Sequence, residues 1–157
     1  MPIPQKIQKF LDSSKIKYEP IEHKTVFTAF DKAKTLKVPE KIIGKTLTVK
    51  LDKTYGLVLI PANKMLDKGK LKKVSKAKSV DFVKEAWMKK NIKGVKLGAI
   101  PPFGNLWKIP TFIDRSLMNQ QKIVVNAGDW NWSIKISPTI FRKIFSDLTI
   151  ESFTKAK

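Results

Sequence analysis

The sequence predicts a single α/β domain of the α+β type, spanning residues 1–157, with a mixed, largely antiparallel sheet or a partly closed barrel flanked by helices. Three observations support this class. The length is that of one ordinary domain, and 42% of the residues are hydrophobic, as in a globular protein. Segments with apolar residues at helical spacing are interspersed with segments that alternate like strands. The loops between these segments are mostly short.

The first half of the chain is predicted to contain two helices, a short strand and a hairpin. Thr28 and Asp31 resemble a weak capping box at the start of the second helix, and Pro39 ends that helix. A polar turn separates two apolar strands further along the chain. In chain order these elements are a helix over 3–14, a strand over 18–23, a helix over 28–38 and hairpin strands over 42–51 and 57–61.

The second half is predicted to continue with helices, a loop rich in glycine and proline, and three more strands. Ser79 is expected to cap a helix that buries a stripe containing Trp87. Ser137 is expected to cap the last helix, with Pro138 at its first position. Residues after Asp147 are expected to fray. The predicted elements are helices over 68–74 and 79–90, a loop over 98–104, strands over 111–114, 122–126 and 132–136, and a helix over 137–145.

The composition excludes several classes of protein. The chain has no cysteine and one histidine, so it offers no disulfide framework, no thiolate nucleophile and no cluster of histidines for a metal. We therefore expect no cofactor and no metal. No apolar run approaches the roughly 20 residues that a membrane span needs, and residues 1–4 have no hydrophobic signal core. We expect a soluble, cytoplasmic protein without a membrane partner.

The charge is strongly positive, with a formal net value of +19. All basic residues except Arg115 and Arg142 are lysines, which suit contact with a phosphate backbone better than base reading. The stretch from Lys64 to Lys96 holds twelve lysines and only three acidic residues. This concentration favours a polyanion partner over a merely solvated helix face. The lysines predicted to bind RNA are Lys64, Lys68, Lys70, Lys72, Lys73, Lys76 and Lys78.

The strand over 42–51 carries a lysine on its apolar face. Alternation places Lys45 on the same face as Leu47 and Val49. Lysines are almost never fully buried without a partner, so Lys45 is predicted to line a pocket, where desolvation would lower its pKa or hold it ready for an anionic group. Two alternatives remain open: the register is shifted by one residue, or the side chain reaches out to water.

The loop Gly98-Ala99-Ile100-Pro101-Pro102-Phe103-Gly104 is a second candidate for the site. Glycine permits close backbone approach to a ligand, and tandem prolines fix the path of the chain, so the loop suits a carbonyl-lined wall facing Lys45. The alternative is a structural turn. His23 is either a catalytic base or a strand-end histidine satisfied by backbone. Trp130 and Trp132 flank a turn, and one of them is expected to be exposed enough to stack on a nucleotide.

Taken in order, these features resemble the YbaK and prolyl-tRNA synthetase-associated editing family over nearly the whole chain. The resemblance is carried by an ordered set of landmarks with suitable spacings. They are the strand ending in His23, Thr28 and Ala29 opening a helix, Ile43-Gly44-Lys45-Thr46-Leu47, the segment 57–71, Gly94 before the Gly98–Gly104 loop, Ile113-Asp114-Arg115-Ser116-Leu117, and Asn126-Ala127-Gly128.

The resemblance implies trans-editing by a free-standing domain that hydrolyses the ester of a mischarged aminoacyl-tRNA, for example Ala- or Cys-tRNA(Pro). It implies that Lys45 is the principal functional side chain and that tRNA is the partner, with prolyl-tRNA synthetase as a second one. The residues that it assigns to substrate binding are Gly98, Ala99, Ile100, Pro101, Pro102, His23, Thr28, Asp114 and Gly128. The chain departs from the synthetase insertion domains, which carry a histidine near the position of 131–133. The alternative is a module of the same fold that binds RNA or aminoacyl-tRNA without hydrolysis.

Overall fold

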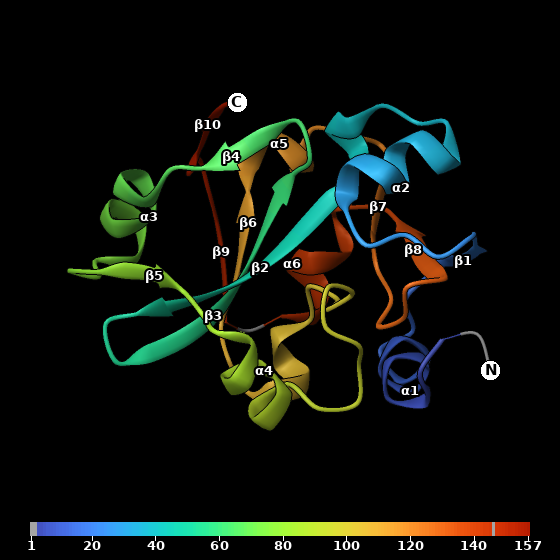
Figure 1. Ribbon diagram of the computed structural model, residues 1–157, viewed down its shortest axis with the longest axis horizontal. Coiled ribbons are helices and arrows are strands. Elements are labelled where there is room, and N and C mark those ends of the chain that lie inside the picture. The colour runs from blue at the N-terminus through green and yellow to red at the C-terminus, as the bar shows by residue number, and fades with distance from the viewer. Residues whose placement is uncertain (1–2, 146) are drawn as a thin grey trace.

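The largest sheet has five strands in the order β5-β2-β3-β6-β9 (Figure 1). A computed structural model describes residues 3–145 and 147–157. The hairpin of β2 and β3 forms the centre of this sheet, with β5 antiparallel on one side, whereas β6 and β9 run parallel to β3 on the other. The strands are β2 (Gly44–Leu51), β3 (Thr54–Pro61), β5 (Val80–Phe82), β6 (Thr111–Asp114) and β9 (Leu148–Glu151).

Two smaller sheets complete the β structure. An antiparallel sheet in the order β1-β8-β7 lies beside the start of β2, to which an isolated bridge between Ile43 and Val124 connects it. A two-stranded sheet pairs β4 with β10 near the C-terminus. These strands are β1 (Glu19–Glu22), β7 (Ile123–Asn126), β8 (Trp132–Ile136), β4 (Lys64–Leu66) and β10 (Thr154–Ala156). The mixed α+β class is thus confirmed, and within the described residues the sheets stay open instead of closing into a barrel.

In the part of the chain that the structure describes, six short helices surround the sheets (Figure 1). In α1, Ile7 and Leu11 are fully buried against the main core. In α2, the Thr28 hydroxyl accepts a hydrogen bond from the Asp31 backbone N–H at 3.1 Å, as the capping pattern predicts. The helices are α1 (Gln5–Ser13), α2 (Ala29–Leu36), α3 (Lys68–Ser75), α4 (Glu85–Asn91), α5 (Arg115–Met118) and α6 (Ile140–Ile144), with short 3₁₀ turns η1 (Glu40–Ile42) and η2 (Gly104–Trp107).

Four apolar clusters form within the described residues, and the two largest hold most of the elements together. The first lies between the β1-β8-β7 sheet and the helices α1 and α6, and it includes the fully buried rings of Phe103 and Phe141. The second lies under the β2–β3 hairpin and includes Phe153 near the C-terminus. Because Leu47 and Val49 belong to this second cluster, the face assigned to Lys45 by alternation is the correct one. Lys45 stands where the cluster ends.

The predicted helix over 79–90 is wrong in its first half. Val80 pairs with Leu51 in strand β5, and helix α4 starts only at Glu85. The Asp52 carboxylate accepts hydrogen bonds from the backbone N–H groups of Lys78 and Ser79, which directs the chain into the sheet. The hairpin turn is also tighter than expected, because β3 already begins at Thr54.

Two expectations about the C-terminal part are wrong as well. The last helix starts at Ile140 with Thr139 at its N-cap, and Ser137 instead shares a hydrogen bond with the Thr139 hydroxyl. The segment after Asp147 does not fray, since it forms β9 and β10 and buries Phe153 completely.

Candidate functional site

A cavity of about 350 Å³ lies where α2, the start of β2 and two loops meet. It is lined by both polar and apolar groups, including three lysines and one aspartate. The structure brings Lys45, Thr28, Gly98 and Ala99 together at this cavity, as the sequence predicts. The remaining lining residues are Val26, Phe27, Ala29, Phe30, Lys32, Ile43, Gly44, Thr46, Ala62, Asn126, Asp129, Trp130 and Lys157.

Lys45 lies at the entrance of the cavity. It is the second residue of β2, pairs with Ile60 of β3, and has an exposed side chain. Lys45 thus lines the cavity as predicted, but its side chain is exposed, which matches the alternative that it reaches out to water. Lys45 also lines a second, neighbouring groove, so this residue is shared by two depressions of the surface.

The loop that starts at Gly98 forms another wall through its backbone. Gly98 has a φ of +84°, a left-handed conformation that glycine adopts without strain. The Gly128 N–H donates to the Ala99 carbonyl at 2.8 Å, and the Asn126 side-chain amide donates to the Ile100 carbonyl at 3.2 Å. Ile100, Pro101 and Pro102 are buried behind the lining, where they support the two residues that face the cavity.

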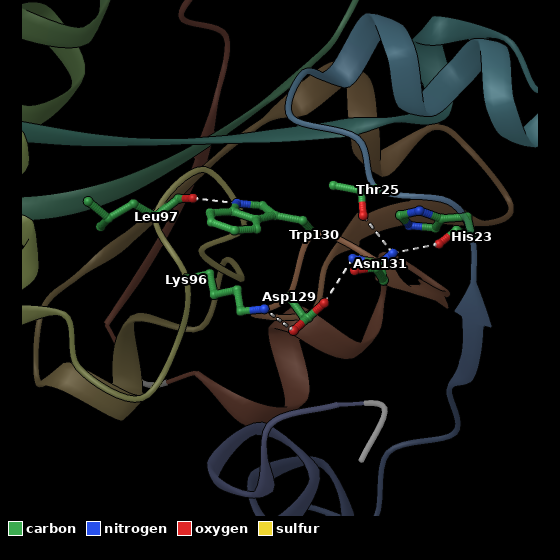
Figure 2. Close-up of polar contacts among 7 residues, drawn as sticks. All are labelled: His23, Thr25, Lys96, Leu97, Asp129, Trp130 and Asn131. Atoms are coloured by element: carbon green, nitrogen blue, oxygen red, sulfur yellow. Dashed lines mark hydrogen bonds and ion pairs between the residues drawn. The ribbon is translucent and has the colours of Figure 1, made fainter.

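A polar network fixes the loop between β7 and β8 (Figure 2). The Lys96 ammonium lies 3.0 Å from the Asp129 carboxylate, and the Trp130 indole N–H donates to the Leu97 carbonyl at 2.7 Å. The Asn131 backbone N–H donates a hydrogen bond to the Asp129 carboxylate at 2.9 Å. Burial acts to raise the pKa of Asp129, but the Asn131 N–H and the Lys96 ammonium hold it below its usual value. Asp129 therefore brings a negative charge to the cavity wall.

Aromatic rings border the entrance. Phe27 and Phe30 are 63% and 57% exposed, which is unusual for large apolar side chains. The ring of Phe27 meets the indole of Trp130 edge-on, with the centroids 5.2 Å apart. Trp130 is half-buried and lines the cavity; Trp132 is half-buried too, so neither tryptophan is as exposed as the sequence suggested. The sequence reasoning did not single out either phenylalanine.

Lys32 is the residue of the cavity that the sequence reasoning missed. It is only 6% exposed, and its ammonium donates a hydrogen bond of 2.5 Å to the Asn126 side-chain oxygen. Burial lowers the pKa of Lys32 to about 8. A sequence signal existed, because Lys32 occupies the apolar face of α2 that also carries Ala29, Ala33 and Leu36.

His23, Gly128 and Asp114 lie outside the cavity lining. The His23 Nδ1–H donates to the Lys24 carbonyl at 2.8 Å, so Nε2 accepts from the Ser133 hydroxyl at 2.9 Å. Burial, aided by the positive charge of Lys32, lowers the pKa of His23 against the opposing effects of the Lys24 carbonyl and Asp129. His23 is thus a neutral, hydrogen-bonded histidine at the end of β1, which matches the second of the two alternatives.

Gly128 and Asp114 have internal partners. Gly128 is buried with a φ of +92° and holds the Gly98 loop through its backbone. Asp114 is 1% exposed, and its carboxylate accepts hydrogen bonds from residues 116, 153 and 154. Both residues support the elements around the site from behind.

The lysines predicted to bind RNA fall into two groups. Lys64 and Lys68 line the second groove, of about 790 Å³, together with Lys45, Lys155 and the 55% exposed ring of Phe82. The Lys68 ammonium lies 4.8 Å from the centroid of that ring. The other five, Lys70, Lys72, Lys73, Lys76 and Lys78, are exposed on and after α3 and do not line the groove.

Neither a metal cluster nor a membrane helix is found in the part of the chain that the structure describes. Over residues 3–145 and 147–157, acidic residues and His23 do not gather in groups of three or more that suit a metal ion. Over the same residues, every helix is too short or too polar to cross a membrane.

The fold and the cavity define a small α+β domain whose candidate site has charged residues in its lining. The model of the aminoacyl-tRNA editing domain family matches residues 23–144. The chain belongs to this family, which confirms the resemblance seen in the sequence. No curated protein sequence matches the chain significantly.

Solved structures share the fold at low sequence identity. The hypothetical protein APE2540 superposes with a TM-score of 0.86 at 20% identity, over 96% of this chain and 100% of its own. A protein described as a candidate trans-editing enzyme for prolyl-tRNA synthetase gives a TM-score of 0.83 at 18% identity, over 99% of both chains. A candidate signal transduction protein from Marinobacter aquaeolei VT8 gives 0.75 at 14% identity, over 97% of this chain but 31% of its own.

Proposed function

We propose that the protein is an aminoacyl-tRNA deacylase that hydrolyses the ester bond of a mischarged tRNA in trans. The observation that supports this most strongly is the meeting of Lys45 with the Gly98–Ala99 backbone at one cavity. The two features are far apart in the sequence, and the fold brings them to the same cavity. Family membership supplies the class of substrate. The reaction would take place in the cytoplasm, where tRNA is charged.

The proposed reaction needs little side-chain chemistry, because an aminoacyl ester is already activated. A water oxygen attacks the ester carbonyl carbon, and the bond from that carbon to the ribose oxygen breaks. The products are the free amino acid and a tRNA with a free terminal hydroxyl. The loop carbonyls and Asp129 would hold the α-ammonium group, and Lys45 would hold the terminal phosphate or stabilise charge at the carbonyl. The neighbouring ribose hydroxyl would assist the attack.

A deacylation panel tests this function. Alanyl-, cysteinyl-, seryl- and prolyl-tRNA are incubated with the wild type, with Lys45→Ala and with Lys53→Ala, an exposed lysine in the turn of the same hairpin. We expect hydrolysis of at least one substrate, and a loss of about ten- to a hundredfold in Lys45→Ala, as expected for one hydrogen bond to a charged group. Lys53→Ala should retain the wild-type rate. Full activity in Lys45→Ala would overturn the assigned role of Lys45.

Binding without turnover in this panel would support the alternative of a non-catalytic module. The first tRNA to test is tRNA(Pro), because one structural neighbour is described as a candidate trans-editing enzyme for prolyl-tRNA synthetase. The same neighbour makes that synthetase the first protein partner to test. A pull-down of the synthetase in the presence and absence of tRNA(Pro) addresses this point.

The groove beside the cavity suits the single-stranded 3′ end of the tRNA. Its lysines provide positive charge near successive phosphates, and Phe82 offers an exposed ring on which a base can stack. Phe27 and Phe30 provide further rings at the entrance of the cavity for the terminal adenine. Since Lys45 lines both depressions, a strand that follows the groove reaches the cavity directly. The exposed lysines of α3 would extend this contact toward the acceptor stem.

Salt dependence measures the phosphate contacts. We expect the logarithm of the tRNA affinity to fall linearly with the logarithm of salt concentration, by about 0.7 per single-strand phosphate and about 0.9 per duplex phosphate contacted. Lys68→Ala should reduce the slope by about 0.7, whereas Lys143→Ala, on the exposed face of α6, should leave it unchanged. Fluorescence anisotropy with labelled tRNA measures both slopes, and a flat response would contradict the phosphate contacts.

A further inference from the structure

We infer that Lys32 recognises the side chain of the aminoacyl group and selects side chains that carry an oxygen acceptor, a hydroxyl or a carboxylate, over apolar ones. The inference rests on the proposed deacylase function and adds a class of amino acid to it. It is derived from the position of Lys32 in the cavity and from the hydrogen bonds around it.

The Lys32 ammonium is a buried donor with spare capacity. An ammonium group has three N–H donors, and in the described structure one of them reaches an acceptor, the side-chain oxygen of Asn126. Among the described residues, no carboxylate lies within 4.0 Å of this ammonium. The residue is 6% exposed and still contributes to the cavity lining, so the accessible part of its side chain faces the ligand space.

Asn126 and the Gly98 loop hold Lys32 in place. The Asn126 oxygen accepts from Lys32, while the Asn126 amide group donates to the Ile100 carbonyl at 3.2 Å. The amide orientation is therefore fixed by both partners, and it presents an acceptor to the ammonium. Together these two hydrogen bonds connect α2, β7 and the loop. A group held by packing and by a bonded partner is suited to discriminate between ligands.

The charges of the cavity orient an aminoacyl group. Its α-ammonium is attracted by Asp129 and by backbone carbonyls, and it is repelled by the charged form of Lys32. With the α-ammonium away from Lys32, the side chain is the part left to meet that residue. A side chain with an oxygen acceptor pairs with the free N–H groups. A methyl group would exclude water from them and leave them without a partner.

The discrimination can be measured without turnover. The ligands are 3′-amino-3′-deoxyadenosine amides carrying seryl, aspartyl or alanyl groups, in which an amide replaces the scissile ester. Calorimetry should show the wild type binding the seryl and aspartyl compounds at least about tenfold more tightly than the alanyl compound. Lys32→Met, which removes the ammonium but keeps most of the length of the side chain, should lose this preference. Lys34→Met, an exposed lysine on the same helix, should keep it.

Two results would overturn the inference: equal or tighter binding of the alanyl compound by the wild type, or an unchanged preference in Lys32→Met. If Lys32→Met fails to fold, the inference is tested on the wild type instead, by NMR titration of the protein with its lysines labelled at Cε. The aspartyl compound should then raise the titration midpoint of the Lys32 amine and the alanyl compound should lower it, and equal midpoints would contradict the inference. Because this experiment measures binding, its outcome does not depend on deacylation. If the preference is seen but no deacylation occurs, the proposed activity is refuted and the inference about Lys32 stands.

Discussion

Between about pH 8 and about pH 10.5, the wild type should gain about 3 kcal/mol of unfolding free energy relative to Lys32→Met. The physical cause is the burial of an amine that can be charged. Burial lowers the pKa of Lys32 to about 8 in the folded protein, against 10.5 for an ordinary lysine. Each unit of this difference corresponds to about 1.4 kcal/mol.

The sign follows from proton uptake. Between the two pKa values of Lys32, the unfolded chain binds the proton and the folded protein does not, so unfolding takes up a proton and stability rises with pH. Below about pH 8 both states are protonated, and the full desolvation penalty of Lys32 persists. Methionine does not titrate, so it removes this slope. His23, whose lowered pKa depends in part on Lys32, titrates below this window.

Urea unfolding of both proteins at a series of pH values measures the difference. The subtraction cancels the titration of the other lysines, which the two proteins share. Loss of the hydrogen bond to Asn126 adds an offset between the curves without changing how they diverge. Lys34→Met should give a curve parallel to the wild type. Parallel curves for the wild type and Lys32→Met would show that the Lys32 amine is not desolvated.

The same kind of sequence pattern marks two of the three cavity lysines, Lys45 and Lys32, yet only Lys45 was predicted to lie at a pocket. Lys45 interrupts the alternation of a strand, and this correctly placed it at a pocket. Lys32 interrupts a helical face made of Ala29, Ala33 and Leu36, a spacing that predicts burial equally well. Because alanine is only weakly apolar, these residues form a weak apolar stripe. The sequence alone therefore does not distinguish a lysine within this stripe from an exposed one. Burial of Lys32 is decided by β7, which supplies Asn126 from the far end of the chain.

Long-range pairing explains what the sequence could not predict. Val83 and Trp87 have helical spacing, but pairing of Val80 with Leu51 takes residues 80–82 into a strand. Strand β9 carries no signal strong enough to be recognised alone, and it forms because a parallel partner, β6, is available to it. The cavity wall at Asp129 depends on Lys96, which no local pattern relates to it. Local patterns therefore predicted the elements and two walls of the site, while its charged interior required tertiary contacts.

Asp114→Ala should destabilise the protein by about 3–5 kcal/mol, because it removes an acceptor on which several buried donors depend. One carboxylate oxygen accepts from the Phe153 N–H at 2.9 Å and from the Thr154 hydroxyl at 3.1 Å. The other accepts from the backbone N–H and the hydroxyl of Ser116 at the start of α5. Phe153 and Thr154 are themselves buried, so water cannot replace the carboxylate unless the end of the chain opens.

The expected consequence is local as well as global. In Asp114→Ala, the Phe153 amide should lose its protection from hydrogen exchange before the strands of the central hairpin do, since β10 depends on this carboxylate. Asp81→Ala, at an exposed position of β5, should change stability by less than about 0.5 kcal/mol. Asp114→Asn keeps one acceptor oxygen for Phe153 and Thr154, so it should lose less than Asp114→Ala.

This experiment also separates two roles for Asp114. The family resemblance assigns it to substrate binding, whereas its burial and its four hydrogen bonds place it behind the site. If its role is structural, unfolding free energy and deacylation should fall together, and deacylation should recover at low temperature, where the variant is folded. A variant that keeps the wild-type stability but loses deacylation would show that Asp114 acts in substrate binding. Comparing the loss of stability with the loss of deacylation therefore decides whether this buried carboxylate binds the ligand or supports the fold.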